Sequence, residues 1–211
     1  MIVAVNKMLK DVRVAIDMNN SSKPLVLDGD TDTLQLDDII RSTLVPAIMQ
    51  VEMEAPSRLL EYGHDFVEDR TIEWGEGGRG SIFLPDDFMR LVTFRMSDWR
   101  RAVFSAISDS DSEYVKLSSR YRGICGTPER PVVAIVNRGE GLVLEFYTCD
   151  STDATVTDSV YVPIPEIKDD GIDVSEKCYK SAVYRAAFLT MASVGDQNAN
   201  TMLEISKSLL I

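Results

Sequence analysis

Few residues of this sequence have the types and the spacing that enzyme chemistry requires. His64 is the only histidine among the 211 residues, so triads that depend on histidine and metal sites built from several histidines are nearly excluded. Asp86 and Asp87 are adjacent, which would point their side chains to opposite faces of a strand, and a capped turn after Pro85 accounts for both. We therefore predict that the protein is not an enzyme and has no catalytic residue.

Two further patterns resemble ligand-binding loops only superficially. Asp28, Asp30 and Asp32 alternate around Gly29, but in a calcium loop the glycine would come later and a glutamate would occupy the twelfth position. The run Gly-Glu-Gly-Gly-Arg-Gly at 75–80 has neither the following helix nor the Gly-Lys-Ser/Thr ending of a phosphate loop. We interpret the first pattern as a turn before a helix and the second as a hairpin loop, and we predict no cofactor and no metal.

Cysteine content and hydropathy indicate where the protein is made. Cys125, Cys149 and Cys178 are odd in number and lack the spacing of metal ligands, so we expect reduced thiols in a product of the cytosol. Charged residues from Lys7 onward interrupt the first apolar stretch, which argues against a signal peptide. No apolar run approaches the roughly 20 residues of a membrane span, so we expect no membrane association.

The net charge of −12 is unevenly distributed. Residues 90–138 carry nine Lys/Arg and five Asp/Glu, whereas the segments on either side are acidic. An acidic chain with one basic belt is a poor general nucleic-acid binder, because phosphate affinity comes from clustered cations. The belt is either ordinary solvated surface or a contact for an acidic neighbour, such as another subunit. Its candidate contact residues are Arg95, Arg100, Arg101, Arg120 and Arg122.

Helical periodicity marks the first quarter of the chain. A stripe of apolar residues spaced by four, three and four predicts a helix over 3–18. This stripe consists of Val5, Leu9, Val12 and Ile16. A second helix is predicted from Asp32 or Thr33 to about residue 54, with a kink or break at Pro46, which removes a backbone hydrogen bond.

The middle third changes to the two-residue period of strands. Predicted strands cover 67–74, 81–84, 92–96, 132–136, 142–148 and 155–162, with a hairpin turn in the sequence Asn-Arg-Gly-Glu-Gly at 137–141. The polar, serine-rich residues 108–121 are predicted to form an exposed loop.

The helical period returns after residue 173. Asp173 and Glu176 have capping-box spacing, so we expect the helix to start there. Residues 182–194 are apolar almost all round, which predicts a helix that is central or lies in an oligomer interface. The last helix ends in three apolar residues that are candidates for docking a partner: Leu209, Leu210 and Ile211.

These elements predict an α+β fold. Helices from both ends of the chain, residues 1–63 and 172–211, would form one discontinuous helical bundle. Residues 64–171 would form a β-rich insertion between them.

Three segments give the sequence a familiar pattern. They are the aspartate-rich turn leading into LDDIIRSTLVPAIMQVEMEAPSRLL (36–60), the run SIFLPDDFMRLVTFR (81–95), and YVPIPEI (161–167) followed by two helices. The best single match is Leu-Pro-x-Asp-aromatic-x-Arg-Leu, here Leu84 to Leu91. In this order the segments resemble the head-to-tail adaptor proteins of short-tailed bacteriophages, the tail tubular protein A family, over most of the chain.

The resemblance implies a structural virion protein. Such an adaptor is made in the host cytoplasm and forms a homo-oligomeric ring of about twelve copies in the phage neck, between the portal protein and the tail or nozzle protein. DNA passes through the ring without specific binding, which an acidic lumen would favour. The resemblance thus makes the portal the partner for residues 209–211 and a subunit or tail protein the partner for the basic belt.

Two alternatives remain open at this stage. One is a virion-associated hydrolase that uses acidic residues, which would need two carboxylates about 5–10 Å apart in a deep pocket. The other is a monomeric binding module that forms no ring.

Overall fold

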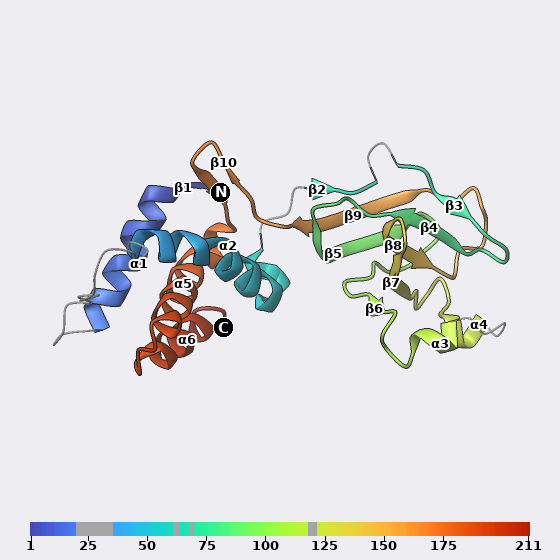
Figure 1. Ribbon diagram of the computed structural model, residues 1–211. Helices are drawn as coiled ribbons and strands as arrows, with labels where there is room; N and C mark the ends of the chain where they lie inside the picture. The colour runs from blue at the N-terminus through green and yellow to red at the C-terminus, as the bar shows by residue number, and fades with distance from the viewer. Residues whose placement is uncertain (20–35, 61–63, 68–69, 118–121) are drawn as a thin grey trace. The chain divides into compact units, whose positions relative to one another are not determined.

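Residues from both ends of the sequence fold together in the computed structural model, which describes residues 1–19, 36–60, 64–67, 70–117 and 122–211. Unit 1 consists of Met1–Glu61 and Ile164–Ile211, and unit 2 consists of Tyr62–Pro163. Helices dominate unit 1 and strands dominate unit 2 (Figure 1). The predicted mixed α+β class is therefore confirmed. The aspartate pattern at 28–32 lies outside the described residues.

Unit 1 contains four helices of ten residues or more in its described part. They are α1 (Val5–Asn19), α2 (Leu36–Glu54), α5 (Tyr179–Ser193) and α6 (Ala199–Ser208). The predicted stripe of α1 is buried, and α2 runs without interruption through Pro46. The break considered at Pro46 is thus absent.

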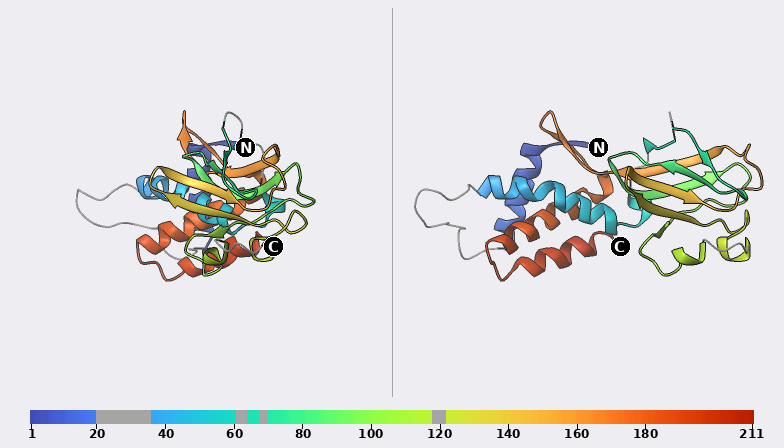
Figure 2. Two further views of the ribbon diagram at one scale, coloured as in Figure 1. Left: turned by 90° about the vertical axis from the view of Figure 1, so that its right-hand side faces the viewer. Right: turned by 45° about the vertical axis from the view of Figure 1, so that its right-hand side comes forward.

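Helix α5 is the central element of unit 1, because it packs against α1, α2 and α6 (Figure 2). Its small side chains Ala182, Ala186 and Ala187 are fully buried, and small residues let helix backbones approach closely. The sequence predicted that this almost wholly apolar helix is either central or lies in an oligomer interface. Packing within one chain is sufficient to account for its apolar surface.

A small sheet completes unit 1, in the order β1 (Ile2–Ala4), β11 (Gly171–Asp173), β10 (Ile167–Lys168). All its pairs are antiparallel, and Val3 lies opposite Ile172. The sequence placed the domain boundary between residues 171 and 172, whereas the boundary between the units lies after Pro163. The β10–β11 hairpin belongs to unit 1 because β11 pairs with the first strand of the chain.

Helix α5 also begins later than the sequence indicated. Asp173 pairs with Ile2 in the small sheet, and a 3-10 turn, η2 (Glu176–Cys178), precedes the helix, so the expected capping box is wrong. The buried carboxylate of Glu52 on α2 accepts a hydrogen bond from the backbone N–H of Ser175 at 2.8 Å instead. Burial raises the pKa of Glu52 above its ordinary value.

The described residues of unit 2 form two sheets. One has the order β2 (His64–Asp65), β9 (Val156–Pro163), β5 (Phe88–Met96). The other has the order β3 (Glu73–Trp74), β4 (Gly80–Phe83), β8 (Gly141–Phe146), β7 (Val133–Arg138), β6 (Ile107–Ser108). All pairs are antiparallel except β6 with β7. Short helices α3 (Tyr114–Leu117) and α4 (Arg122–Cys125) follow β6, so the loop expected over 108–121 is wrong at α3.

Aromatic side chains from both sheets share one core in unit 2. Phe94 of β5 lies 5.6 Å from the ring of Trp99 and 5.8 Å from the ring of Phe146 on β8. Gly80 lies directly against Phe146, where any Cβ would collide with the ring. This core holds β5 and β8 in place, and the polar residues Arg95 and Glu145 lie on these two strands.

One buried cation connects the helices of unit 1. The Arg185 side chain on α5 is 3% exposed and forms a bidentate ion pair with Glu54 on α2, at 2.7 and 3.0 Å. It also donates to Gln50 at 3.2 Å and to the Ser206 hydroxyl on α6 at 3.3 Å. Ser206 and Ser181 exchange further hydrogen bonds, so α2, α5 and α6 share one polar network.

Replacing Arg185 by methionine should destabilise unit 1 selectively. The change keeps the apolar stem but removes four hydrogen bonds, so we expect a loss of about 2–4 kcal/mol in the free energy of unfolding. Both tryptophans, Trp74 and Trp99, lie in unit 2, so far-UV circular dichroism in urea would report the helices while tryptophan fluorescence follows unit 2.

The matched control is Arg41→Met. Arg41 forms an exposed pair with Asp170 at 3.4 Å, and such pairs contribute about 1 kcal/mol at most. Equal losses in the two variants, or a loss seen only by tryptophan fluorescence, would contradict the role given to Arg185.

Candidate functional site

The described part of the predicted basic belt lies on unit 2. Arg95 on β5 is half-buried, and its Nε donates to the Trp99 carbonyl at 3.3 Å, so it helps to close the turn after that strand. Arg100 and Arg101 follow the turn and are exposed. The structure therefore separates Arg95, which has an internal structural contact, from two arginines that face solvent.

Arg100 also contacts a second loop, which contains Pro128 and Glu129. Its backbone N–H donates to the Pro128 carbonyl at 2.9 Å, and its guanidinium lies 3.7 Å from Glu129. Both side chains of this pair are more than half exposed, so the pair adds little stability. Arg120 lies outside the described residues, and of Arg122 only the backbone, in α4, is described.

The predicted docking residues at the end of the chain differ in exposure. Ile211 is 92% exposed and Leu209 is 39% exposed, whereas Leu210 is buried. Arg58 donates a hydrogen bond to the Ile211 carbonyl at 2.7 Å, which holds the segment against the helical unit. Two of the three side chains are thus available to a partner, and the third is part of the core.

A polar network that the sequence analysis did not identify lies on the five-stranded sheet. Glu145 on β8 accepts hydrogen bonds from Tyr147 at 2.6 Å, from Tyr114 at 3.2 Å and from Arg138 at 2.7 Å. Arg138 on β7 also lies 3.8 Å from Glu73 on β3. The network joins the adjacent strands β7 and β8, the edge strand β3 and the short helix α3.

The electrostatics of this network favour a fixed anion. Burial alone would raise the pKa of Glu145, but the hydrogen bonds from Tyr147, Arg138 and Tyr114 outweigh burial and lower it. The pKa of Tyr147 is raised by burial and by the adjacent Glu145 carboxylate. Glu145 is therefore ionised and accepts hydrogen bonds from three side chains, which suits a structural anchor better than a proton donor or acceptor.

The sequence contains one feature from which part of this network could have been predicted. Glu145 is the single charged residue in the apolar run Leu142–Thr148, and a charge on a half-buried strand requires a partner. Tyr147, two residues later, points to the same face. Tyr114 and Arg138 come from distant segments, and no local pattern indicated that they would meet Glu145.

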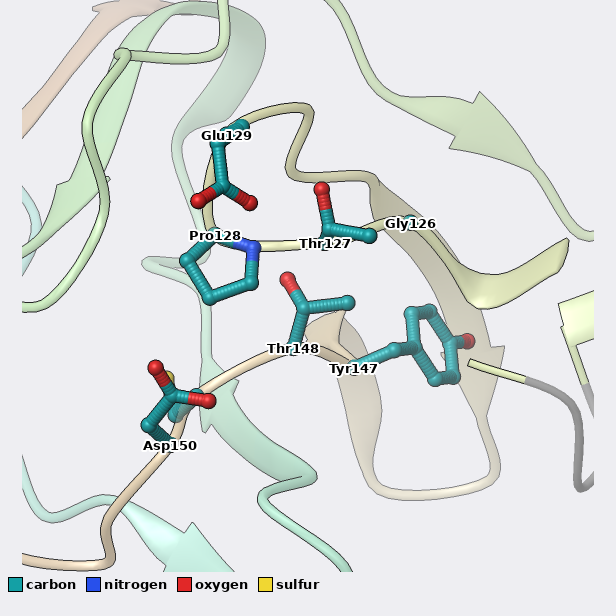
Figure 3. Close-up of a pocket in the computed structure, with 8 residues that line it drawn as sticks. Gly126, Thr127, Pro128, Glu129, Tyr147, Thr148 and Asp150 are labelled. Carbon is teal, nitrogen blue, oxygen red and sulfur yellow. The ribbon is translucent and has the colours of Figure 1, made fainter. Parts of the chain in front are cut away.

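Two cavities border the network. The larger, about 360 Å³, lies over β3 and β4 and reaches Arg138 and Glu145. The smaller, about 260 Å³, lies between residues 126–129 and 147–150 (Figure 3). Tyr147 borders both cavities.

Within the described ranges, no group of three or more His, Cys, Asp or Glu is placed to hold a metal ion. None of the helices in those ranges is long and apolar enough to span a bilayer. His64 lies in β2 opposite Tyr161, and Asp87 accepts a hydrogen bond from the Tyr161 hydroxyl at 2.9 Å.

Comparison with known proteins does not assign the chain to a family. No protein-family model matches the sequence, and no curated protein is significantly similar to it. The resemblance to tail tubular protein A thus stays a prediction.

Replacing Glu145 by glutamine should destabilise unit 2 by about 1–3 kcal/mol at neutral pH, because three donors lose a charged acceptor. The folded pKa of Glu145 is lowered, so its contribution is present above the unfolded pKa of about 4.3 and is lost as pH falls. Urea unfolding followed by tryptophan fluorescence should therefore show a difference between wild type and variant that shrinks toward low pH. Glu140→Gln in the exposed β7–β8 turn is the control, and a pH-independent difference would refute the assignment.

Proposed function

We propose that this protein is a head-to-tail adaptor of a short-tailed bacteriophage, a structural ring component between the portal and the tail. In this proposal the helices of unit 1 are the bundle of the adaptor and unit 2 is its β-rich insertion. The protein has no catalytic role, is made in the host cytoplasm and resides in the virion neck. DNA passes through the ring of about twelve copies without specific contacts.

The observation that carries the proposal is the order in which the resembling segments fall on structural elements. The first forms α2 and the 3-10 turn η1 (Ser57–Leu59), the second forms β4, the turn and β5, and the third ends β9 and reaches β10. The first and last elements belong to unit 1, and the contiguous stretch between them makes unit 2. This organisation supports an adaptor that works by assembly.

Charge distribution supports a ring built from unlike surfaces. Arg100 and Arg101 are exposed on unit 2, while the β10–β11 turn of unit 1 and the residues after it expose carboxylates. Those carboxylates are Asp169, Asp170, Asp173 and Glu176. A cyclic ring uses heterologous contacts, in which a basic surface of one copy meets an acidic surface of the next. Acidic residues left facing a lumen would repel DNA phosphates and let the genome slide.

Reversing both exposed charges of the belt should prevent ring assembly. We expect Arg100→Glu with Arg101→Glu to abolish rings that the wild-type chain forms alone or on its portal, because like charges would then face each other across each interface. Mass photometry and negative-stain imaging would count the copies. Lys116→Glu, another exposed cation of unit 2, should leave assembly intact, and rings in the double variant would refute the belt as an interface.

Portal docking by the chain end can be tested without disturbing the core. Leu209→Asp with Ile211→Asp changes two exposed side chains and keeps the buried Leu210. We expect portal binding, measured by co-sedimentation, to fall at least about tenfold while the circular dichroism spectrum stays unchanged. Unaltered binding would remove the docking role of residues 209–211.

A further inference from the structure

Strand β1 leaves one of its edges open. It lies at the end of the small sheet of unit 1 and pairs only with β11. The backbones of Met1 and Val5 bond to the residues that flank β11, at 3.1 and 2.8 Å, so the odd-numbered residues of this segment face β11. In an antiparallel ladder the backbone groups of Ile2 and Ala4 then point to the opposite edge. Among the described residues, none forms a hydrogen bond with them there.

Unit 2 has a second open edge, in the segment 101–105 that follows β5. Val103 and Phe94 exchange both of their backbone hydrogen bonds, at 2.8 and 2.9 Å. The backbone groups of Ala102 and Phe104 therefore point away from β5, and no residue in the described ranges bonds to them. Each unit thus offers the backbone of two residues to a further strand.

Side chains alternate in the same way along both edges. Val3 is buried in unit 1, and Val103 packs against the aromatic core of unit 2. Ile2 is 81% exposed and Phe104 is 66% exposed, although each is the neighbour of a core residue. An open strand edge with exposed apolar side chains is a template for pairing with another chain. The two edges are therefore suited to strand addition.

The two edges differ in charge. Asp169 and Asp170 form the turn before β11, and both are exposed. Arg101, at the start of the second edge, is exposed and makes no ion pair with a described residue. Opposite charges favour the pairing of these unlike edges over the pairing of two like edges. Because one chain carries both edges, a second copy of the chain can supply the partner of each.

We propose that β1 of one copy pairs antiparallel with the segment 101–105 of the next copy, so that a strand ladder links successive subunits. This rests on the proposed function, because it names the contact between subunits of the proposed ring. Ile2 lies opposite Phe104 and exchanges both backbone hydrogen bonds with it. Ala4 lies opposite Ala102 and donates its N–H to the Ala102 carbonyl.

Charge selects the direction of this pairing. In the antiparallel arrangement Arg101 comes beside Val5, whose N–H is bonded to the Asp170 carbonyl, and so reaches the acidic turn. A parallel strand would carry Arg101 toward Asp173, whose carboxylate already pairs with the Met1 amino group at 3.1 Å. So short a ladder is weak for an isolated dimer, but a closed ring uses both edges of every copy.

The first experiment traps the contact without requiring a ring. A full chain with Ala4→Cys is mixed with a full chain with Ala102→Cys under a mild oxidant, and covalent dimers are detected by non-reducing electrophoresis. Opposite residues of a hydrogen-bonded pair lie about 5.5 Å apart between their Cα atoms, which a disulfide can span. The native cysteines are buried. We expect at least about tenfold more dimer in the mixture than in either variant alone.

The matched control replaces Ala102→Cys by Ala106→Cys, which moves the thiol about 13 Å along an extended chain and should give no excess dimer. Circular dichroism spectra equal to that of the wild type show that each variant is folded. Equal dimer yields with the thiol at 102 and at 106, or no excess dimer from folded variants, would overturn the proposal.

The second experiment measures the apolar contact in the assembled protein. Mass photometry compares wild type and Phe104→Gln over a range of concentrations, and we expect the variant to need about tenfold more protein to form rings, because its apolar side chain is lost from the interface. Val115→Gln changes another exposed apolar residue of unit 2, on α3, and should assemble like wild type. Equal assembly of Phe104→Gln and wild type would contradict the strand contact.

The outcomes separate this contact from the proposed function. Wild-type rings without the covalent dimer would overturn the strand pairing while the adaptor function stands. Covalent dimers from a chain that forms no ring, alone or with its portal, would refute the adaptor function while the pairing of two copies stands.

Discussion

The helical unit depends on a cation that is almost entirely out of water. Arg185 would be costly to bury alone, and four acceptor contacts on α2 and α6 offset that cost. Because the guanidinium is a planar fork, these contacts also restrict the rotation and sliding of three helices against each other. The alanines of α5 supply close packing, but apolar contacts alone would tolerate several registers. The ion pair therefore selects one register among them.

The β-rich unit is also organised around a partly buried charge, but this charge is negative. Glu145 is a partly buried anion, and two tyrosines and an arginine satisfy it. Both networks place one ionised side chain between elements that are distant in sequence, where an unsatisfied charge would be penalised strongly. In each unit the polar centre thus adds specificity to a core whose stability comes mainly from apolar burial.

Local patterns predicted the local elements well. The stripe of Val5, Leu9, Val12 and Ile16 became the buried face of α1, and the hairpin turn at 137–141 joins β7 to β8. Both depend on neighbours within a few residues, which sequence periodicity and turn chemistry record directly. The predicted capping box at Asp173 was wrong for the complementary reason. Asp173 pairs with Ile2, which is far away along the chain, and this pairing overrode the local capping signal.

The candidate sites were predictable only in part. Charge clustering identified Arg100 and Arg101, which are exposed, but it could not distinguish them from Arg95, whose Nε is held by the Trp99 carbonyl. The Glu145 network was missed because its partners Tyr114 and Arg138 come from segments that are distant in the sequence. Such sites arise where distant segments meet in the fold, and a search by residue type cannot find them.

Unit 1 is built from two separate stretches of the chain, and this has a consequence during translation. Helices α1 and α2 emerge from the ribosome before the whole of unit 2, and their packing partner α5 follows only after it. At about 5–20 residues per second, the buried faces of α1 and α2 wait on the order of ten seconds for their partner. Unit 2 is contiguous and can fold in that interval. A nascent chain of this kind exposes its early apolar helices to chaperones, and its production is expected to depend on them more than on the final stability of either unit.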